Sequence, residues 1–177
     1  MPELPEVETV VRGLRPCLTG ETIANVTVHW PRSIARPDPE QFVAQLTGRT
    51  VRAVDRRGKW IVIRLDDGHA LLVHLRMTGQ LLLELTACPP ANYTRVVFDL
   101  KSGGRLRFSD MRKFGRLILT NNPREVLDDL GPEPLGDAFT LERFQHMLGE
   151  RRGRVKSLLL DQRFLAGLGN IYVNEAL

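Results

Sequence analysis

The feature that most limits how this chain can fold is a run of short apolar segments between residues 26 and 120. Val, Ile and Leu dominate the segments, and Gly-containing turns separate several of them, which is the pattern of a β-sandwich or barrel. About eight strands are predicted, over residues 26–30, 50–57, 59–65, 69–75, 80–85, 94–100, 105–109 and 116–120. A Pro-rich break at Pro89 and Pro90 interrupts the run.

Two helices are predicted beside these strands. Residues 5–14 carry apolar side chains at helical spacing, and Pro16 is expected to end this first helix. Asp38 and Pro39 suit the N-cap and first position of a second, short helix, which Gly48 would close.

The composition changes near residue 121, where Pro and Gly become frequent. Helices are predicted beyond this point, over residues 141–148, 155–160 and 171–177. The fold class is therefore expected to be α+β, with an N-terminal β-sandwich and flanking helices followed by a helical region. The predicted boundaries are a β-rich domain over 1–121, a connector over 122–139 and a helical part over 140–177.

Positive charge is concentrated in three stretches, residues 49–60, 101–116 and 143–156. The 25 basic residues outnumber the 21 acidic ones, and only four of the basic residues are lysines. Arginine suits bidentate contacts with phosphate, so these stretches could follow a polyanion. Solvated surface charge explains the same pattern equally well.

Signals for other protein classes are weak. Cys17 and Cys88 are too few for a disulfide scaffold or a Cys-rich metal site. No signal peptide is visible, and the apolar runs are too short to cross a membrane. We expect a cytoplasmic protein without a membrane partner.

Pro2 is the first candidate for chemistry. Removal of Met1 before this small residue would expose a secondary amine, which can attack a carbonyl-like carbon and form an iminium ion or act as a base. Glu3 could transfer protons beside it. A Pro followed by Glu is also a common helix start, and from these residues alone that interpretation is favoured.

Other candidates lie in predicted turns. Lys59 follows Gly58 in a basic turn and could reach a phosphate, and Asn170 begins a helix whose N–H groups and side-chain amide could do the same. Met77 and Phe114 could wedge into a base stack. Taken singly, each has an ordinary structural explanation: a solvated hairpin, an N-cap or a core side chain.

Together these motifs resemble the bacterial formamidopyrimidine-DNA glycosylases, which excise oxidised purines from DNA. The resemblance covers nearly the whole chain. It rests on residues 1–9, 57–59, 74–77, 112–115, 130–135 and 169–172. The related endonuclease VIII branch usually has Gly where this chain has Leu4, so the purine branch is favoured.

The resemblance implies a role for each matching residue. Pro2 would be the nucleophile at C1′ and Glu3 the acid, with Glu6 as a supporting carboxylate and Lys59 also in the catalytic group. Contacts to phosphate around the lesion are implied for Lys59, His74, Lys156 and Asn170. The void left by the flipped base would be filled by Met77, Arg112 and Phe114, with Arg112 facing the orphaned cytosine.

The resemblance also implies a bifunctional glycosylase and lyase that acts as a monomer on duplex DNA in the bacterial cytoplasm. Family members continue into further helices and a four-cysteine zinc finger. This sequence has neither, so the helical part is expected to be partial, no metal or other cofactor is expected and DNA binding should be weaker.

Two other classes stay open. A non-catalytic DNA-binding fragment would keep the basic surface and lack the free amine. An N-terminal-proline enzyme of small molecules would need Pro2 but neither Arg112 nor Asn170.

Overall fold

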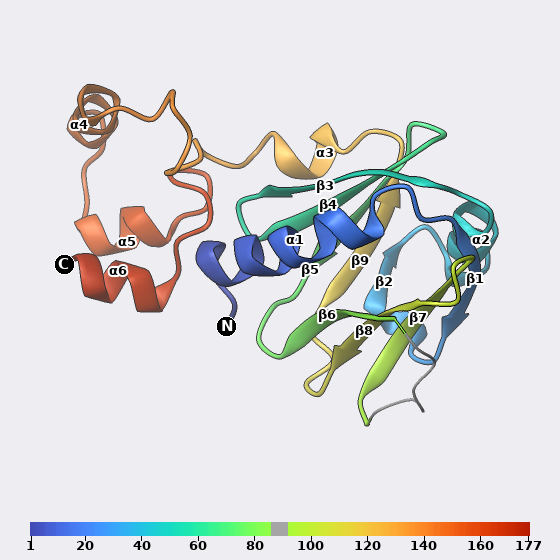
Figure 1. Ribbon diagram of the computed structural model, residues 1–177. Helices are drawn as coiled ribbons and strands as arrows, with labels where there is room; N and C mark the ends of the chain where they lie inside the picture. The colour runs from blue at the N-terminus through green and yellow to red at the C-terminus, as the bar shows by residue number, and fades with distance from the viewer. Residues whose placement is uncertain (86–91) are drawn as a thin grey trace.

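The computed structural model describes residues 1–85 and 92–177, and shows two β-sheets packed face to face beside a helical lobe (Figure 1). The first sheet has the order β1 (Ile23–Val28), β7 (Thr94–Leu100), β8 (Arg105–Asp110) and β6 (Gly79–Glu84). The second has the order β2 (Ile34–Arg36), β9 (Arg116–Thr120), β5 (Ala70–His74), β4 (Trp60–Leu65) and β3 (Val51–Arg57). All pairings are antiparallel except that of β2 with β9. The α+β prediction is confirmed, whereas Cys88, Pro89 and Pro90 lie outside the described residues.

The core lies between the two sheets and continues under two helices. The helix α1 (Leu4–Leu18) packs on β3, and α2 (Pro39–Leu46) packs on β1. Asp38 caps α2 as predicted, because its carboxylate accepts hydrogen bonds from the N–H groups of Glu40 and Gln41. This core therefore fixes both the start of α1 and the strand ends that surround the N-terminus.

Three local predictions were wrong. The first helix does not stop at Pro16 but continues to Leu18. Pro16 removes one backbone hydrogen bond from the last turn, but Leu18 beyond it is buried in the core, and this packing keeps the turn helical. The predicted strands omitted β2, which has only three residues, and the connector contains a one-turn helix, α3 (Arg124–Leu127).

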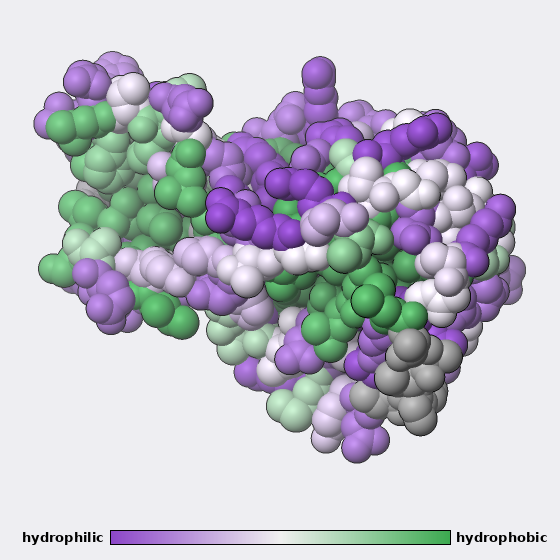
Figure 2. Space-filling model, viewed as in Figure 1, coloured by the Kyte–Doolittle hydropathy of each residue, from purple (hydrophilic) through white to green (hydrophobic). Residues whose placement is uncertain are grey.

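The helical lobe contains α4 (Leu141–Gly149), α5 (Val155–Leu160) and α6 (Asn170–Ala176). A small core of its own holds Leu159, Phe164, Leu165 and Val173. Figure 2 shows apolar side chains gathered over this lobe. Among the described residues, no helix is both long enough and apolar enough to cross a bilayer.

Glu133 joins the helical lobe to the β-sandwich. Its carboxylate accepts hydrogen bonds from Arg56 at 2.6 Å, from Arg57 at 3.0 Å and from the backbone N–H of Gly58 at 2.5 Å. Arg57 also donates to the carbonyl oxygens of Leu130 and Gly131. The loop before the helical lobe is thus attached to the turn that precedes Lys59.

We expect Glu133→Ala to lower the free energy of unfolding by about 2 kcal/mol, because Arg57 and the Gly58 N–H lose their carboxylate acceptor, while Arg56 keeps its ion pair with Glu8. Urea denaturation followed by circular dichroism measures the change. Glu125→Ala is the control, since its ion pair with Arg36 is exposed, and we expect less than about 1 kcal/mol there. Equal losses in the two variants would contradict a joining role for Glu133.

Candidate active site

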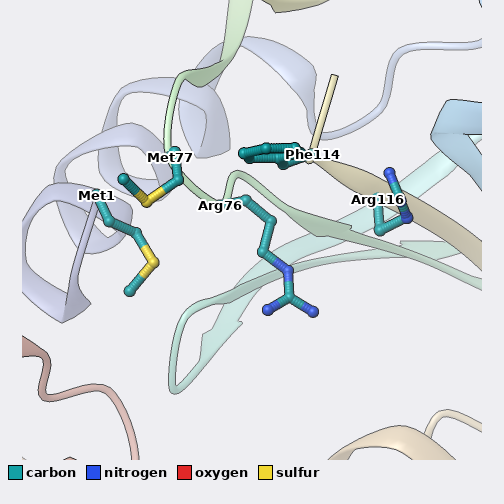
Figure 3. Close-up of a pocket in the computed structure, with 5 residues that line it drawn as sticks. All are labelled: Met1, Arg76, Met77, Phe114 and Arg116. Carbon is teal, nitrogen blue, oxygen red and sulfur yellow. The ribbon is translucent and has the colours of Figure 1, made fainter. Parts of the chain in front are cut away.

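The first residue of the chain lies on a pocket of about 350 Å³. Met1 lines it from the segment before α1, Arg76 and Met77 from the loop after β5, and Phe114 and Arg116 from the end of the β8–β9 loop and the start of β9 (Figure 3). These three segments are far apart in sequence. The fold therefore brings the N-terminus to the same cavity as two of the predicted wedge residues.

Glu3 connects this N-terminus to the helical lobe. Its side chain is 2% exposed, and its carboxylate accepts hydrogen bonds from the backbone N–H groups of Gly169 (2.6 Å), Ile171 (2.9 Å) and Tyr172 (3.4 Å). A Cβ on Gly169 would lie 2.5 Å from the Glu3 carboxyl group, so a larger residue at that position would displace the carboxylate. The acid is consequently held beside residue 2 by partners more than 160 positions away in sequence.

Glu6 also lies beside this N-terminal segment. It accepts hydrogen bonds from the Glu3 N–H and the Tyr172 hydroxyl, both at 2.8 Å. Burial opposes ionisation, but these two donors and the positive N-terminus hold the pKa of Glu6 below its ordinary value. The bond to Glu6 in turn raises the pKa of Tyr172. A carboxylate that stays ionised therefore lies near the chain's terminal amine.

Lys59 is 6% exposed, which is unusual for a lysine. Burial lowers its pKa, the nearby Glu3 carboxylate opposes that shift, and Arg76 adds to it. Lys59 is thus electrostatically coupled to the predicted acid and to a residue of the pocket. The solvated-hairpin interpretation is wrong for this side chain.

His74 is buried at the end of β5, where its ring meets Trp60 edge-on with 4.8 Å between centroids. Burial lowers its pKa to about 3, with Arg76 and Lys59 adding to the shift. Its Nδ1 accepts the Arg76 N–H at 3.1 Å, which assigns the ring proton to Nε2. The neutral imidazole can therefore offer one N–H to a phosphate oxygen.

The depressed pKa of His74 predicts an acid-dependent loss of stability. Below its ordinary pKa of 6.5 the unfolded chain binds a proton that the folded chain does not bind until about pH 3. The free energy of unfolding of the native chain should therefore decrease as the pH is lowered from 6 to 4. Its decrease should exceed that of His74→Asn by about 1 kcal/mol for each pH unit. Urea titrations at several pH values measure this difference, and parallel curves would contradict it.

The predicted wedge residues Met77 and Phe114 are 42% and 46% exposed, so they are not core side chains. The guanidinium carbon of Arg112 lies 4.8 Å from the centroid of the Phe114 ring. All three residues are on loops at the rim of the sandwich. The structure therefore brings the predicted void-filling group together at one exposed edge.

The sequence analysis missed Asp110, which braces these two loops. Asp110 is 1% exposed and accepts hydrogen bonds from the Thr78 hydroxyl and from the backbone N–H groups of Arg112 and Gly115. Its one sequence signal is a carboxylate directly after the predicted strand over residues 105–109. Tyr172 and Arg76 lie in the ranges that carry the family resemblance, but the sequence predicts no role for them.

Two predicted contacts are less well defined. Asn170 is exposed as the first residue of α6, but Gly169 is the N-cap, and Glu3 already occupies the N–H groups of Gly169, Ile171 and Tyr172. Those three N–H groups are therefore taken, and the Asn170 side chain is the group of the prediction that is left to bind phosphate. Lys156 is exposed on α5, and its role stays a prediction. Over residues 1–85 and 92–177, no cluster of His, Cys, Asp and Glu is arranged to hold a metal ion.

Comparison with known proteins decides the family. The profile of the formamidopyrimidine-DNA glycosylase N-terminal domain matches residues 1–117, which is more than half of the chain. The chain belongs to the formamidopyrimidine-DNA glycosylase family. The profile of that family's H2TH domain matches residues 130–177.

Relatives of the same name support this assignment. The formamidopyrimidine-DNA glycosylases of Moorella thermoacetica and Protochlamydia amoebophila are 50% and 47% identical to the chain and cover all of it. The chain spans 66% and 64% of those two proteins, just under two thirds of their length.

Solved structures agree with the fold. A Lactococcus lactis Fpg in complex with abasic-site-containing DNA is 36% identical, with a TM-score of 0.88 over 98% of this chain and 65% of its own. A mutant of the Lactococcus lactis protein with Fapy-dG-containing DNA gives a TM-score of 0.89 at the same identity, over 98% of this chain and 65% of its own.

Proposed function

We propose that this formamidopyrimidine-DNA glycosylase chain is a bifunctional glycosylase and abasic-site lyase of base excision repair. Its substrate is duplex DNA that carries an oxidised purine, such as 8-oxoguanine or a formamidopyrimidine. The observation that carries the proposal is the pocket that unites the N-terminus with the exposed loops, next to the anchored Glu3 carboxylate. Combined base removal and strand cutting require an amine near base-replacing side chains, with an acid close to the amine.

The reaction begins once Met1 is removed and Pro2 carries a free secondary amine. The lone pair of that nitrogen attacks C1′, the bond from C1′ to the base breaks, and the base leaves with a proton. Glu3, held beside residue 2, donates the proton to the sugar or the base. Opening of the sugar ring leaves an iminium ion between Pro2 and C1′.

The iminium ion then withdraws electrons from the sugar. Loss of a C2′ proton expels the 3′ phosphate, a second elimination expels the 5′ phosphate, and water hydrolyses the iminium to return the amine. The reaction consists of a substitution, a ring opening, two eliminations and a hydrolysis, so no oxidant or reductant is consumed. Glu6 is kept ionised by its hydrogen bonds from Tyr172 and Glu3, and its negative charge stabilises the positive iminium ion on the nearby Pro2.

Binding of the lesion depends on groups around the same pocket. The Lys59 ammonium and the His74 Nε2–H bind the phosphates that flank the flipped nucleotide. The side-chain amide of Asn170, in the helical lobe, also binds phosphate there. Met77, Arg112 and Phe114 fill the space that the base leaves. That insertion offsets part of the few kcal/mol that base flipping costs.

A single assay tests the function. The protein is incubated with a labelled duplex that holds 8-oxoguanine opposite cytosine, and with the same duplex without the lesion. We expect a one-nucleotide gap with phosphate at both ends in the damaged duplex only. Binding without any cut would instead support the non-catalytic DNA-binding fragment, and neither binding nor cutting would support a small-molecule enzyme.

A further inference from the structure

The two neighbouring cations of the β8–β9 loop point to different aromatic rings. Arg112 lies over Phe114, whereas the ammonium of Lys113 lies 3.9 Å from the centroid of Trp30, in the segment that follows β1. Lys113 has a φ of 61°, in the left-handed region that a side chain other than Gly seldom adopts. This strained turn sends two consecutive cations in two directions, which is a reason to look for a function at the second one.

The side chains around Trp30 form a cationic patch, defined here as Trp30, Arg32 and Lys113. The guanidinium carbon of Arg32 lies 5.8 Å from the centroid of the same ring. Arg32 and Lys113 are both exposed, and within the described residues neither is paired with a carboxylate. By contrast, Arg56 and Arg107, on β3 and β8, are held by acids.

Cations held in place by an aromatic ring, with no acid to neutralise them, keep their full charge for an anion outside the protein. The patch borders the loop that carries Arg112 and Phe114, but it shares no residue with the pocket that Met1 lines. Under the proposed function the damaged strand enters that pocket, and Arg112 and Phe114 fill the duplex beside it. Because the patch adjoins the wedge loop and lies outside the pocket, we take the strand that meets it to be the undamaged one.

We propose that Trp30, Arg32 and Lys113 bind the phosphate backbone of the strand opposite the lesion. This inference rests on the proposed function, because it takes the position of the damaged strand from it. Lys113 is the phosphate ligand, Arg32 adds charge, and Trp30 fixes the ammonium in place. The patch would keep the undamaged strand in register while the wedge separates it from the flipped nucleotide.

Binding measurements on a duplex with a tetrahydrofuran abasic-site analogue opposite cytosine test the patch. Each phosphate contact makes affinity vary with salt concentration to the power of about −0.9. Lys113→Gln should therefore bind about fivefold to tenfold more weakly at 0.1 M salt. The slope of log affinity against log salt concentration should be smaller by about 0.9. Trp30→Leu should lose a similar factor, and Trp30→Phe, which keeps a ring beneath the ammonium, should lose less. Circular dichroism checks that each variant is folded.

Lys101→Gln is the matched control. Lys101 lies in the turn before β8, whereas Lys113 follows the end of β8, so the two exposed lysines are at opposite ends of one strand. Removal of the same charge there should leave the affinity within about twofold of the native value and the salt slope unchanged. An equal loss in the two variants would overturn the proposal, since it would reflect net charge alone.

Neutral methylphosphonates identify the strand. When they replace the phosphates opposite the lesion, Lys113→Gln should bind as the native chain does, whereas the difference should persist when they replace phosphates of the damaged strand. The reverse pattern would overturn the proposal. Failure of the proposed function is recognised separately, because the native chain would then show no preference for the abasic analogue over an intact duplex.

Discussion

Retention of Met1 is expected to abolish base excision and strand cutting. In Pro2→Leu the bulky second residue keeps Met1 in place, so the nitrogen of residue 2 remains in a peptide bond and its lone pair is delocalised. The terminal amine then belongs to Met1, one residue away, and a displacement of about 1 Å already costs about 100-fold in a positioned reaction. We expect the single-turnover cutting rate to fall by at least about 1,000-fold.

Pro2→Gly is the matched control for that variant. Glycine is small enough to permit removal of Met1, and it leaves a primary amine in the place of the proline nitrogen. Cutting should therefore continue, at a reduced rate because the amine is less rigidly held. Mass spectrometry of both purified chains establishes whether Met1 is present. Cutting by a Met1-bearing Pro2→Leu chain at the native rate would contradict the role of residue 2.

Glu3→Gln should separate the two activities. Loss of the acid is expected to slow release of 8-oxoguanine by about 100-fold to 10,000-fold. Cutting at a preformed abasic site should stay within about tenfold of the native rate, because no base has to leave. Both rates are measured under single-turnover conditions with the same protein preparation.

The structure adds a stability effect to this substitution. A glutamine oxygen can still accept the N–H groups of Gly169 and Tyr172, but its NH2 group would face the N–H of Ile171, which costs about 1 to 3 kcal/mol. Glu175→Gln, an exposed position on α6, is the control and should leave both rates within about twofold. Equal loss of both activities in a folded Glu3→Gln chain would mean that Glu3 only braces the N-terminus.

Much of the fold could be predicted because each long element has a periodic local pattern. β7, β9 and α5 begin and end where the sequence predicts. The errors fall where tertiary packing outweighs local preference. Burial of Leu18 carries α1 past Pro16, and β2 is a three-residue strand that exists only because β9 lies beside it.

The candidate site was predictable only in part. Pro2, Glu3 and the wedge residues carry chemistry that can be identified in the sequence, and their family motifs point to them. Their mutual support could not be predicted, because it depends on contacts between distant segments. Glu3 meets Gly169, Glu133 meets Arg57, and Asp110 ties Thr78 to the wedge loop. No local pattern encodes those pairs.

Borohydride trapping followed by peptide mapping tests the amine mechanism most directly. The native protein is mixed with the 8-oxoguanine duplex and sodium borohydride, the covalent complex is digested, and the peptide that carries the sugar remnant is sequenced by mass spectrometry. The mechanism predicts a single modification on the nitrogen of Pro2, in a chain that has lost Met1. A modification on Lys59 or another lysine, or cutting without any trapped complex, would contradict it.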